Sequence, residues 1–276
     1  MFGRHFLAYG VRIALGVDCP ALLDRFVHGY LPFGWRPVED HEPEAAASVQ
    51  YLLLADEAEP SYRLYAGTTL VAAVRTLTDV GWALATHAEP FVAEHAPDHL
   101  FVHAGVVGWE GRAIVMPGTS FAGKTTLVRA WLEAGATYYS DEFAVLDRAG
   151  RVHPFARPLA IREGSNGVTR RVPVAALGAD IGTTPLPVGL VLVTAFRPGA
   201  RWRPRGLTPA TALLALMRHT VAARGNPEHS MPILKRVVSD GVAFAGARGE
   251  AGTMVSAVRK HTGAPTPSAL AQRGAN

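Results

Sequence analysis

Residues 118–125 read GTSFAGKT and match the pattern G-x-x-x-x-G-K-[ST] of a phosphate-binding loop. Glycines at both ends let successive backbone amides point at an anion, and the Lys124 ammonium would reach the outer phosphates of a nucleotide. The Thr125 hydroxyl would bind Mg²⁺. We therefore expect a nucleoside triphosphate, with ATP as the first candidate, to be bound by Gly118, Thr119, Ser120, Phe121, Ala122, Gly123, Lys124, Thr125 and Thr126.

Two adjacent acids, Asp141 and Glu142, follow the apolar segment ATYYS, 17 and 18 residues after Lys124. One helix and one returning strand would bring these carboxylates beside the phosphate loop. One carboxylate can orient Mg²⁺, and the other can accept a proton from an attacking hydroxyl. We expect Asp141 to be the base and Glu142, with Thr125, to serve the metal, although the sequence leaves open which acid does which.

The elements around the loop follow from alternation, spacing and turn residues. Residues 100–107 and 112–116 are predicted to be strands of a hairpin whose turn reads GWEG. Apolar residues at helical spacing predict a helix over 124–134, ended by Gly135. Further strands are expected over 136–139, 143–146 and 186–196, a helix from Thr208 to about Arg224, and a last helix over 232–238.

The first part of the chain is predicted to be a small α/β unit. The patterns indicate strands over 9–17, 49–55 and 62–66, a helix over 20–30, an exposed loop over 37–44 and a second helix over 70–88. We place a domain boundary after Pro97, which gives an acidic N-terminal domain (1–97) and a catalytic domain (98–261). The small, polar, proline-bearing segment 262–276 is expected to be a disordered tail.

Charge separates the two parts, because residues 1–97 carry a net charge of −6 and residues 98–276 a net charge of +10. A basic domain attracts phosphates or acidic peptides through its long-range field. Of the 27 basic residues only three are lysines, and one of them, Lys124, is in the loop, where a compact flexible charge is required. The single cysteine, Cys19, excludes an intrachain disulfide and favours a cytoplasmic location.

Several classes of protein are disfavoured. A guanine-specific GTPase needs an Asn-Lys-x-Asp element, and no lysine here follows an asparagine. The segment RWRPR at 201–205 is predicted to be a hairpin tip rather than a nucleic-acid surface. No apolar run reaches membrane-spanning length, and no histidine pair has metal-binding spacing. We expect neither nucleic acid nor membrane as a partner.

Three segments together carry a family resemblance: HAGVV at 103–107, GTSFAGKTT at 118–126 and YYSDE at 138–142. In order and spacing they resemble the catalytic core of HPr kinase/phosphorylase and its relatives, including the kinases of lasso-peptide clusters that phosphorylate a serine of the precursor peptide. The resemblance covers roughly residues 99–160. It implies an α/β phosphate-loop fold related to phosphoenolpyruvate carboxykinase, Mg²⁺-dependent transfer from ATP to a serine hydroxyl, a cytoplasmic location and self-association.

The resemblance also assigns roles to residues. His103 corresponds to the active-site histidine, residues of the GTSFAGKT segment to the phosphate loop and Asp141 to the catalytic acid. Glu142 departs from the family pattern, which has a second aspartate in the members specific for HPr. The family's later signature is reduced here to AIREG at 160–164. Arg162, Arg170 and Arg171 are candidates to meet charge on the γ-phosphate or on the substrate.

The sequence therefore predicts an ATP- and Mg²⁺-dependent serine kinase whose substrate is a peptide or protein. Two alternatives remain open at this stage. One is a kinase for a small-molecule hydroxyl, and the other is a nucleotide-sensing module without transfer chemistry. These patterns leave open which molecule accepts the phosphoryl group and which nucleotide base is preferred.

Overall fold

The computed structural model describes residues 1–39, 48–56, 61–119, 122–163, 168–221, 223 and 225–262. The chain forms two compact units, Met1–Phe101 with Val221–Ser230, and Val102–Thr220 with the residues from Met231 onward. The division after Phe101 lies four residues beyond the boundary predicted at Pro97, and a short later segment joins the first unit. The predicted mixed α/β class is confirmed.

The N-terminal unit contains one six-stranded sheet with the order β3-β1-β2-β4-β5-β6. All neighbouring strands are antiparallel except β2 and β4, which are parallel because α1 lies in the connection between them. The elements are β1 (Phe2–Ala8), β2 (Val11–Val17), α1 (Pro20–Gly29), β3 (Trp35–Pro37), β4 (Ser48–Ala55), β5 (Tyr62–Ala66), β6 (Thr69–Val74) and α2 (Leu77–His95).

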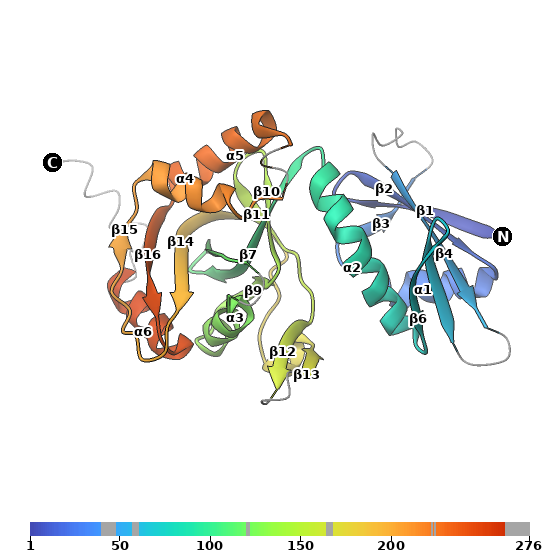
Figure 1. Cartoon of the computed structure of the whole chain (residues 1–276), viewed down its shortest axis with the longest axis horizontal. Coiled ribbons are helices and arrows are strands. Elements are labelled where there is room, and N and C mark those ends of the chain that lie inside the picture. Colours follow the sequence, from blue (N-terminus) through green and yellow to red (C-terminus); the bar gives the residue numbers. More distant parts are fainter. Residues whose placement is uncertain are drawn as a thin grey trace. The chain divides into compact units, whose positions relative to one another are not determined.

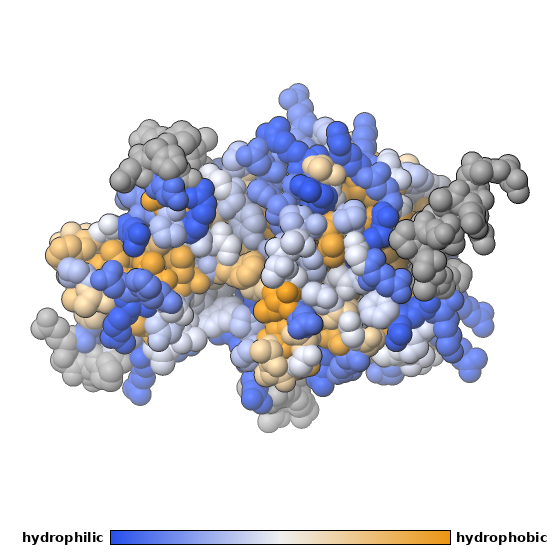
Figure 2. Space-filling view, turned by 180° about the vertical axis from the view of Figure 1, so that it is seen from behind, coloured by the Kyte–Doolittle hydropathy of each residue, from blue (hydrophilic) through white to orange (hydrophobic). Residues whose placement is uncertain are grey.

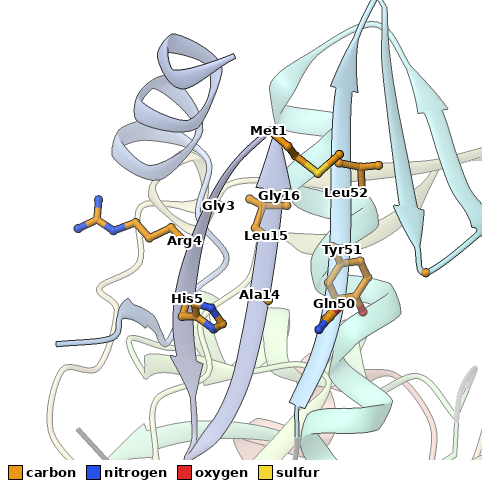
Figure 3. Close-up of a pocket in the computed structure, with 11 residues that line it drawn as sticks. Met1, Gly3, Arg4, His5, Ala14, Leu15, Gly16, Gln50, Tyr51 and Leu52 are labelled. Carbon is orange, nitrogen blue, oxygen red and sulfur yellow. The ribbon is translucent and has the colours of Figure 1, made fainter. Parts of the chain in front are cut away.

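One face of this sheet is buried and the other is hollowed. Alternate residues of β2, such as Ile13 and Leu15, are buried, as are Leu22 and Phe26 of α1. On the other face short side chains leave a concavity of about 340 Å³, in which Met1 and Leu52 lie toward one end and His5 toward the other (Figure 3). Figure 2 shows hydrophobic surface gathered on part of this unit.

The second unit contains an eight-stranded mixed sheet with the order β11-β10-β7-β8-β14-β16-β15, and β9 pairs with β7 (Figure 1). A separate hairpin pairs β12 with β13. The strands are β7 (His99–Trp109), β8 (Arg112–Pro117), β9 (Thr137–Ser140), β10 (Phe143–Asp147), β11 (Arg151–His153), β12 (Leu159–Glu163), β13 (Val168–Val172), β14 (Leu186–Phe196), β15 (Arg205–Gly206) and β16 (Val242–Arg248). The helices are α3 (Lys124–Glu133), η1 (Val174–Leu177), α4 (Pro209–Met217), α5 (Pro227–Asp240) and α6 (Ala251–Thr262).

The strand predicted before the GTSFAGKT segment and the helix predicted to begin in it are confirmed by β8 and α3. Since β7 is antiparallel to both β8 and β9, β8 and β9 run in the same direction on either side of it. Their carboxyl ends therefore meet at one edge of the sheet, where the phosphate loop follows β8 and the two acids follow β9. This edge is the usual place for ligands in α/β sheets.

Helix α3 is held against the sheet by a hydrophobic cluster. Leu127, Val128 and Trp131 of α3 pack with Met254 and Val258 of α6 and with residues of β8 and β14. A glycine at position 105 of β7 makes the close approach of α3 to the strand possible, because a Cβ there would lie 2.7 Å from Val128 Cγ2 and 3.7 Å from Lys124 Cβ. The packing of this glycine thus fixes the position of the helix that carries Lys124.

Replacing Gly105 by alanine is expected to destabilise the protein by about 1–3 kcal/mol, the usual cost of overpacking a core. The branched Val128 side chain has one preferred rotamer in a helix, so α3 itself must shift. Thermal unfolding of the variant measures the effect. Gly252→Ala in α6 is the matched control, because a Cβ at that position meets nothing within 4 Å and alanine favours a helix. Equal unfolding temperatures for the two variants would contradict the expectation.

Several predicted boundaries are wrong. The expected strand over 9–17 is β2, which begins only at Val11 after a turn at Tyr9 and Gly10, both with positive φ, and β1 before that turn was not predicted. Of the expected helix over 70–88, the first part is strand β6, and the helix begins at Leu77. The helix expected to reach Arg224 ends at Met217.

Elements were also missed at the C-terminal end of the chain. The helix predicted over 232–238 is the longer α5, and β16 and α6 were not predicted. The predicted strand over 186–196 coincides with β14. Most of the predicted loop over 37–44 and nearly all of the predicted tail lie outside the described residues.

Candidate active site

Lys124 is the first residue of α3, and its side chain folds back over the phosphate loop. Its ammonium donates hydrogen bonds to the carbonyls of Gly118 (3.0 Å) and Thr119 (3.1 Å), and the residue is buried. Burial lowers the pKa of this ammonium, while the charges of Glu142 and Asp141 oppose that change. A buried cation at a helix N-terminus, with one of its three donors left for another acceptor, is a site for an anion.

The GTSFAGKT segment and the acids after β9 are in contact, as predicted, through the side chains of Thr125 and Asp141. The Thr125 hydroxyl donates a hydrogen bond of 3.0 Å to Asp141 Oδ2, and the Tyr138 hydroxyl lies 3.1 Å from Asp141 Oδ1. The same tyrosine hydroxyl lies 2.9 Å from the carbonyl of Arg157. Asp141 is buried, and burial raises the pKa of its carboxyl, although the bonds from Thr125 and Tyr138 and the charge of Arg157 oppose the rise.

Glu142 has a different environment from that of Asp141. Its carboxylate lies 3.6 Å from Nδ1 of His103, and about a third of its side chain is exposed. The interaction with His103 lowers the pKa of Glu142, with further help from Lys124 and Arg157 and against the effect of burial. The two adjacent acids therefore differ, since Asp141 is enclosed by hydroxyl groups and Glu142 is a more exposed carboxylate beside a histidine.

The first residues of β7 that belong to this unit join three separate segments of the site. The amide of Gly118 donates to the carbonyl of His103 (3.1 Å), and the amide of Ala104 donates to the carbonyl of Glu142 (3.1 Å). The amide of His103 donates to the carbonyl of His219 (2.7 Å), in the segment after α4. Backbone hydrogen bonds thus fix the loop, the acids and this later segment relative to one another.

A cavity of about 400 Å³ lies beside the loop, lined by His103, Thr119, Arg218, His219 and Thr220. Burial lowers the pKa of His219, and the charges of Lys124, His103 and Arg218 lower it further. The cavity thus has a histidine of lowered basicity on one wall, an exposed arginine at position 218 and the His103–Glu142 pair beside it. It can receive a polar group next to the phosphate loop.

Arg218 at the cavity was not predicted, and neither were three further basic residues of the site. Arg157 favours the charged forms of Asp141 and Glu142, His219 lines the cavity, and Arg248 donates to the carbonyl of Gly123 (3.1 Å). Gly123 has a φ of 80°, and a Cβ on it would collide with the Arg248 guanidinium. Only long-range contacts bring these residues to the site, and a single arginine in an arginine-rich chain gives no signal of that.

The predicted substrate arginines belong to the hairpin of β12 and β13. Arg162 is in β12, while Arg170 and Arg171 are exposed on β13, in the separate two-stranded sheet. Ser120 and Phe121 of the predicted loop lie outside the described residues, as does much of the segment between β12 and β13. Thr126 is in the first turn of α3.

The side-chain oxygens of Thr125 and Asp141 fit the ligands of a magnesium ion. Mg²⁺ takes one or two carboxylates or hydroxyls from a protein and fills its remaining positions with phosphate oxygens and water. A hydroxyl and a carboxylate 3.0 Å apart beside an anion site match this requirement. Among the described residues no three His, Cys, Asp or Glu side chains form a group that could hold a metal ion by themselves.

No helix within the described ranges is long and apolar enough to cross a lipid bilayer. Comparison of the chain with protein-family models and with curated proteins found no match.

Proposed function

We propose that the chain is an ATP- and Mg²⁺-dependent kinase of the HPr-kinase-like type that phosphorylates a serine hydroxyl of a peptide or protein. The observation that carries the proposal is the hydrogen bond between Thr125 of the phosphate loop and Asp141 after the returning strand. A phosphate loop alone binds nucleotides in many classes of protein. A loop beside a cavity, with one buried and one partly exposed carboxylate next to it, offers the charge neutralisation and the proton acceptor that transfer to a hydroxyl requires.

The geometry supports a division of roles between the acids that reverses the sequence expectation. Asp141 contacts the Thr125 hydroxyl, so these two residues would hold Mg²⁺, which would offset the charge of the phosphates. Glu142 is more exposed and lies beside His103, which lines the cavity. Glu142 is ionised at neutral pH and lies on the cavity side of the acid pair, within reach of a hydroxyl bound there, so its position makes it the better candidate for the base.

In the proposed reaction the serine Oγ forms a bond to the γ-phosphorus as the bond from that phosphorus to the β,γ-bridging oxygen breaks. The hydroxyl proton passes to the Glu142 carboxylate, and ADP leaves with the charge of the broken bond. Lys124 neutralises charge on the phosphates. Arg218 lines the cavity and places a positive charge beside the peptide that accepts the phosphoryl group. Positioning and charge neutralisation account for most catalysis in this chemistry.

The direct test is mass spectrometry of serine-containing peptides, some of them ending in serine, after incubation with Mg-ATP. A mass increase of one phosphoryl group with the native chain, and none with Lys124→Ala, is expected. Phosphorylation only of free serine, sugars or alcohols would replace the peptide by a small-molecule acceptor. Tight ATP binding with no phosphorylated product from any acceptor would overturn the kinase proposal in favour of a nucleotide sensor.

The acid limb of the pH–rate profile should depend on His103. Glu142 must be ionised to accept a proton, and the interaction with His103 lowers its pKa. In His103→Gln the carboxyl pKa should rise toward its ordinary value, so kcat/KM should begin to fall at a higher pH than in the native chain. Rates measured across the acid range, with a peptide that the mass-spectrometric test shows to be phosphorylated, check this expectation.

His153→Gln is the matched control, since His153 also contacts a carboxylate, that of Asp147 at 3.2 Å, but is on β11. Its pH profile should equal that of the native chain. An unchanged acid limb in His103→Gln would show that Glu142 is not the titrating base.

A further inference from the structure

Phe196, the last residue of β14, is an exposed aromatic ring at the edge of the sheet where the phosphate loop lies. About half of its surface is accessible, at 51%. Strands β8, β14 and β16 are parallel neighbours, so their carboxyl ends share one edge. A single exposed phenylalanine is ordinary on a protein surface, but this one is at the edge where α/β proteins bind ligands.

Arg248 links this ring to the phosphate loop. It is paired with Phe196 in the β14–β16 register, and its guanidinium lies over the ring with Cζ 5.3 Å from the centroid. Its Nη2 donates 3.1 Å to the Gly123 carbonyl, and its Nη1 donates 3.2 Å to that of Gly249. Arg248 is only 3% exposed. One buried side chain therefore fixes the aromatic ring relative to the residue that precedes Lys124.

We propose that the Phe196 ring is the platform on which the base of the bound nucleotide stacks. The inference rests on the proposed function in one respect, which is that a nucleoside triphosphate occupies the loop. With its phosphates at Lys124, the nucleoside must leave the loop toward one side. On one side of β8 and the loop lie β7 and β9 with the two acids, and on the other side lie β14 and β16. The base can therefore extend toward β14 and β16.

The chemistry of the ring suits this role. Stacking of a base on an aromatic side chain contributes binding free energy whichever base is present, because every base has a π-face. The guanidinium over the Phe196 ring adds a cation–π contact that holds the ring in place. Since stacking does not read the hydrogen-bonding edge of a base, ATP and GTP should bind with similar affinities.

The test compares Mg-ATP with Mg-tripolyphosphate, which has the same phosphates and no base, by calorimetry on the full chain. Phe196→Ala should weaken ATP binding about tenfold or more, the effect expected for loss of one stacked base, and should leave tripolyphosphate binding within about twofold. Phe196→Trp should retain ATP affinity. Leu214→Ala, which removes another exposed apolar side chain of this unit, should change neither affinity.

Each outcome bears on the inference. Unchanged ATP affinity in Phe196→Ala, or an equal loss for both ligands, would overturn it, the latter because the loop itself would have been disturbed. A selective loss of ATP affinity in a chain that transfers no phosphoryl group would support the base site and contradict the kinase proposal. Absence of binding of either ligand to the native chain would overturn both.

Discussion

Lys124→Ala should lower the rate of phosphoryl transfer by about 10²–10³-fold or more, the cost of removing one preorganised charge-stabilising donor. The ammonium is buried in the loop and donates to two of its carbonyls, so the variant loses both the charge that would meet the phosphates and two bonds that order the loop. Single-turnover kinetics with Mg-ATP measure the transfer step, and binding of tripolyphosphate should weaken in parallel.

The control for this prediction is Lys235→Ala. Lys235 is an exposed lysine on α5, so the variant makes the same change in net charge without touching the loop. It should have native kinetics. If both lysine variants lost activity equally, the effect would come from the overall field of the basic unit rather than from the loop.

Asp141→Asn should separate activity from stability. Transfer should fall by about 10²–10³-fold, because a neutral amide cannot hold a divalent cation with Thr125 as a carboxylate can. The thermal midpoint should nevertheless be retained or rise by about 2–4 °C, the shift that about 1 kcal/mol produces in a domain of this size. Scanning calorimetry and transfer assays on the same preparation measure both quantities.

The sign of the stability change follows from the pKa of Asp141. Burial raises this pKa above the value in the unfolded chain, so ionisation at neutral pH disfavours the folded state. This destabilisation is fully present above the folded-state pKa and disappears as the pH falls below the unfolded one. An asparagine carries no such charge, and its amide can still pair with the hydroxyls of Thr125 and Tyr138.

Asp147→Asn provides the opposite case in the same unit. Burial alone would raise the pKa of Asp147, but bonds from Arg151 and His153 lower it below its ordinary value. Its charge therefore stabilises the fold at neutral pH, and that contribution is lost as the pH falls through the folded-state pKa. Asp147→Asn should lower the thermal midpoint and leave transfer unchanged. A fall in midpoint for Asp141→Asn as well would contradict the assignment of Asp141 as a destabilising buried charge.

The local structure around residues 118–125 could be predicted from the sequence. The spacing of Gly118, Lys124 and Thr125 is typical of a loop that binds phosphate, and the strand and helix around it have clear alternation and helical periodicity. The step from the motif to Asp141 required only that one helix and one strand return to the same edge. That arrangement is common enough in α/β folds to be inferred without a structure.

The parts that the sequence did not predict depend on distant packing. The segment TLVAAV at the start of the expected helix over 70–88 is a short apolar run, which fits a strand or a buried helix equally until its neighbours β5 and α2 are known. Arg248 ends a strand that was not predicted, and it reaches Gly123 across the sheet. The roles of Asp141 and Glu142 depend on their differing burial, which adjacent letters in a sequence do not reveal.

The backbone bonds at His103 and Ala104 have a consequence for folding. The motif at 118–125 is contiguous, but the amide of Gly118 bonds to His103 in β7, and β7 also bonds to the turn at Glu142 and to the segment at His219, which are distant parts of the chain. Contacts between residues far apart in sequence form late, because the chain entropy of closing them must first be overcome. During synthesis residues 118–125 would therefore acquire their final arrangement with β7 only after the segment around His219 has left the ribosome.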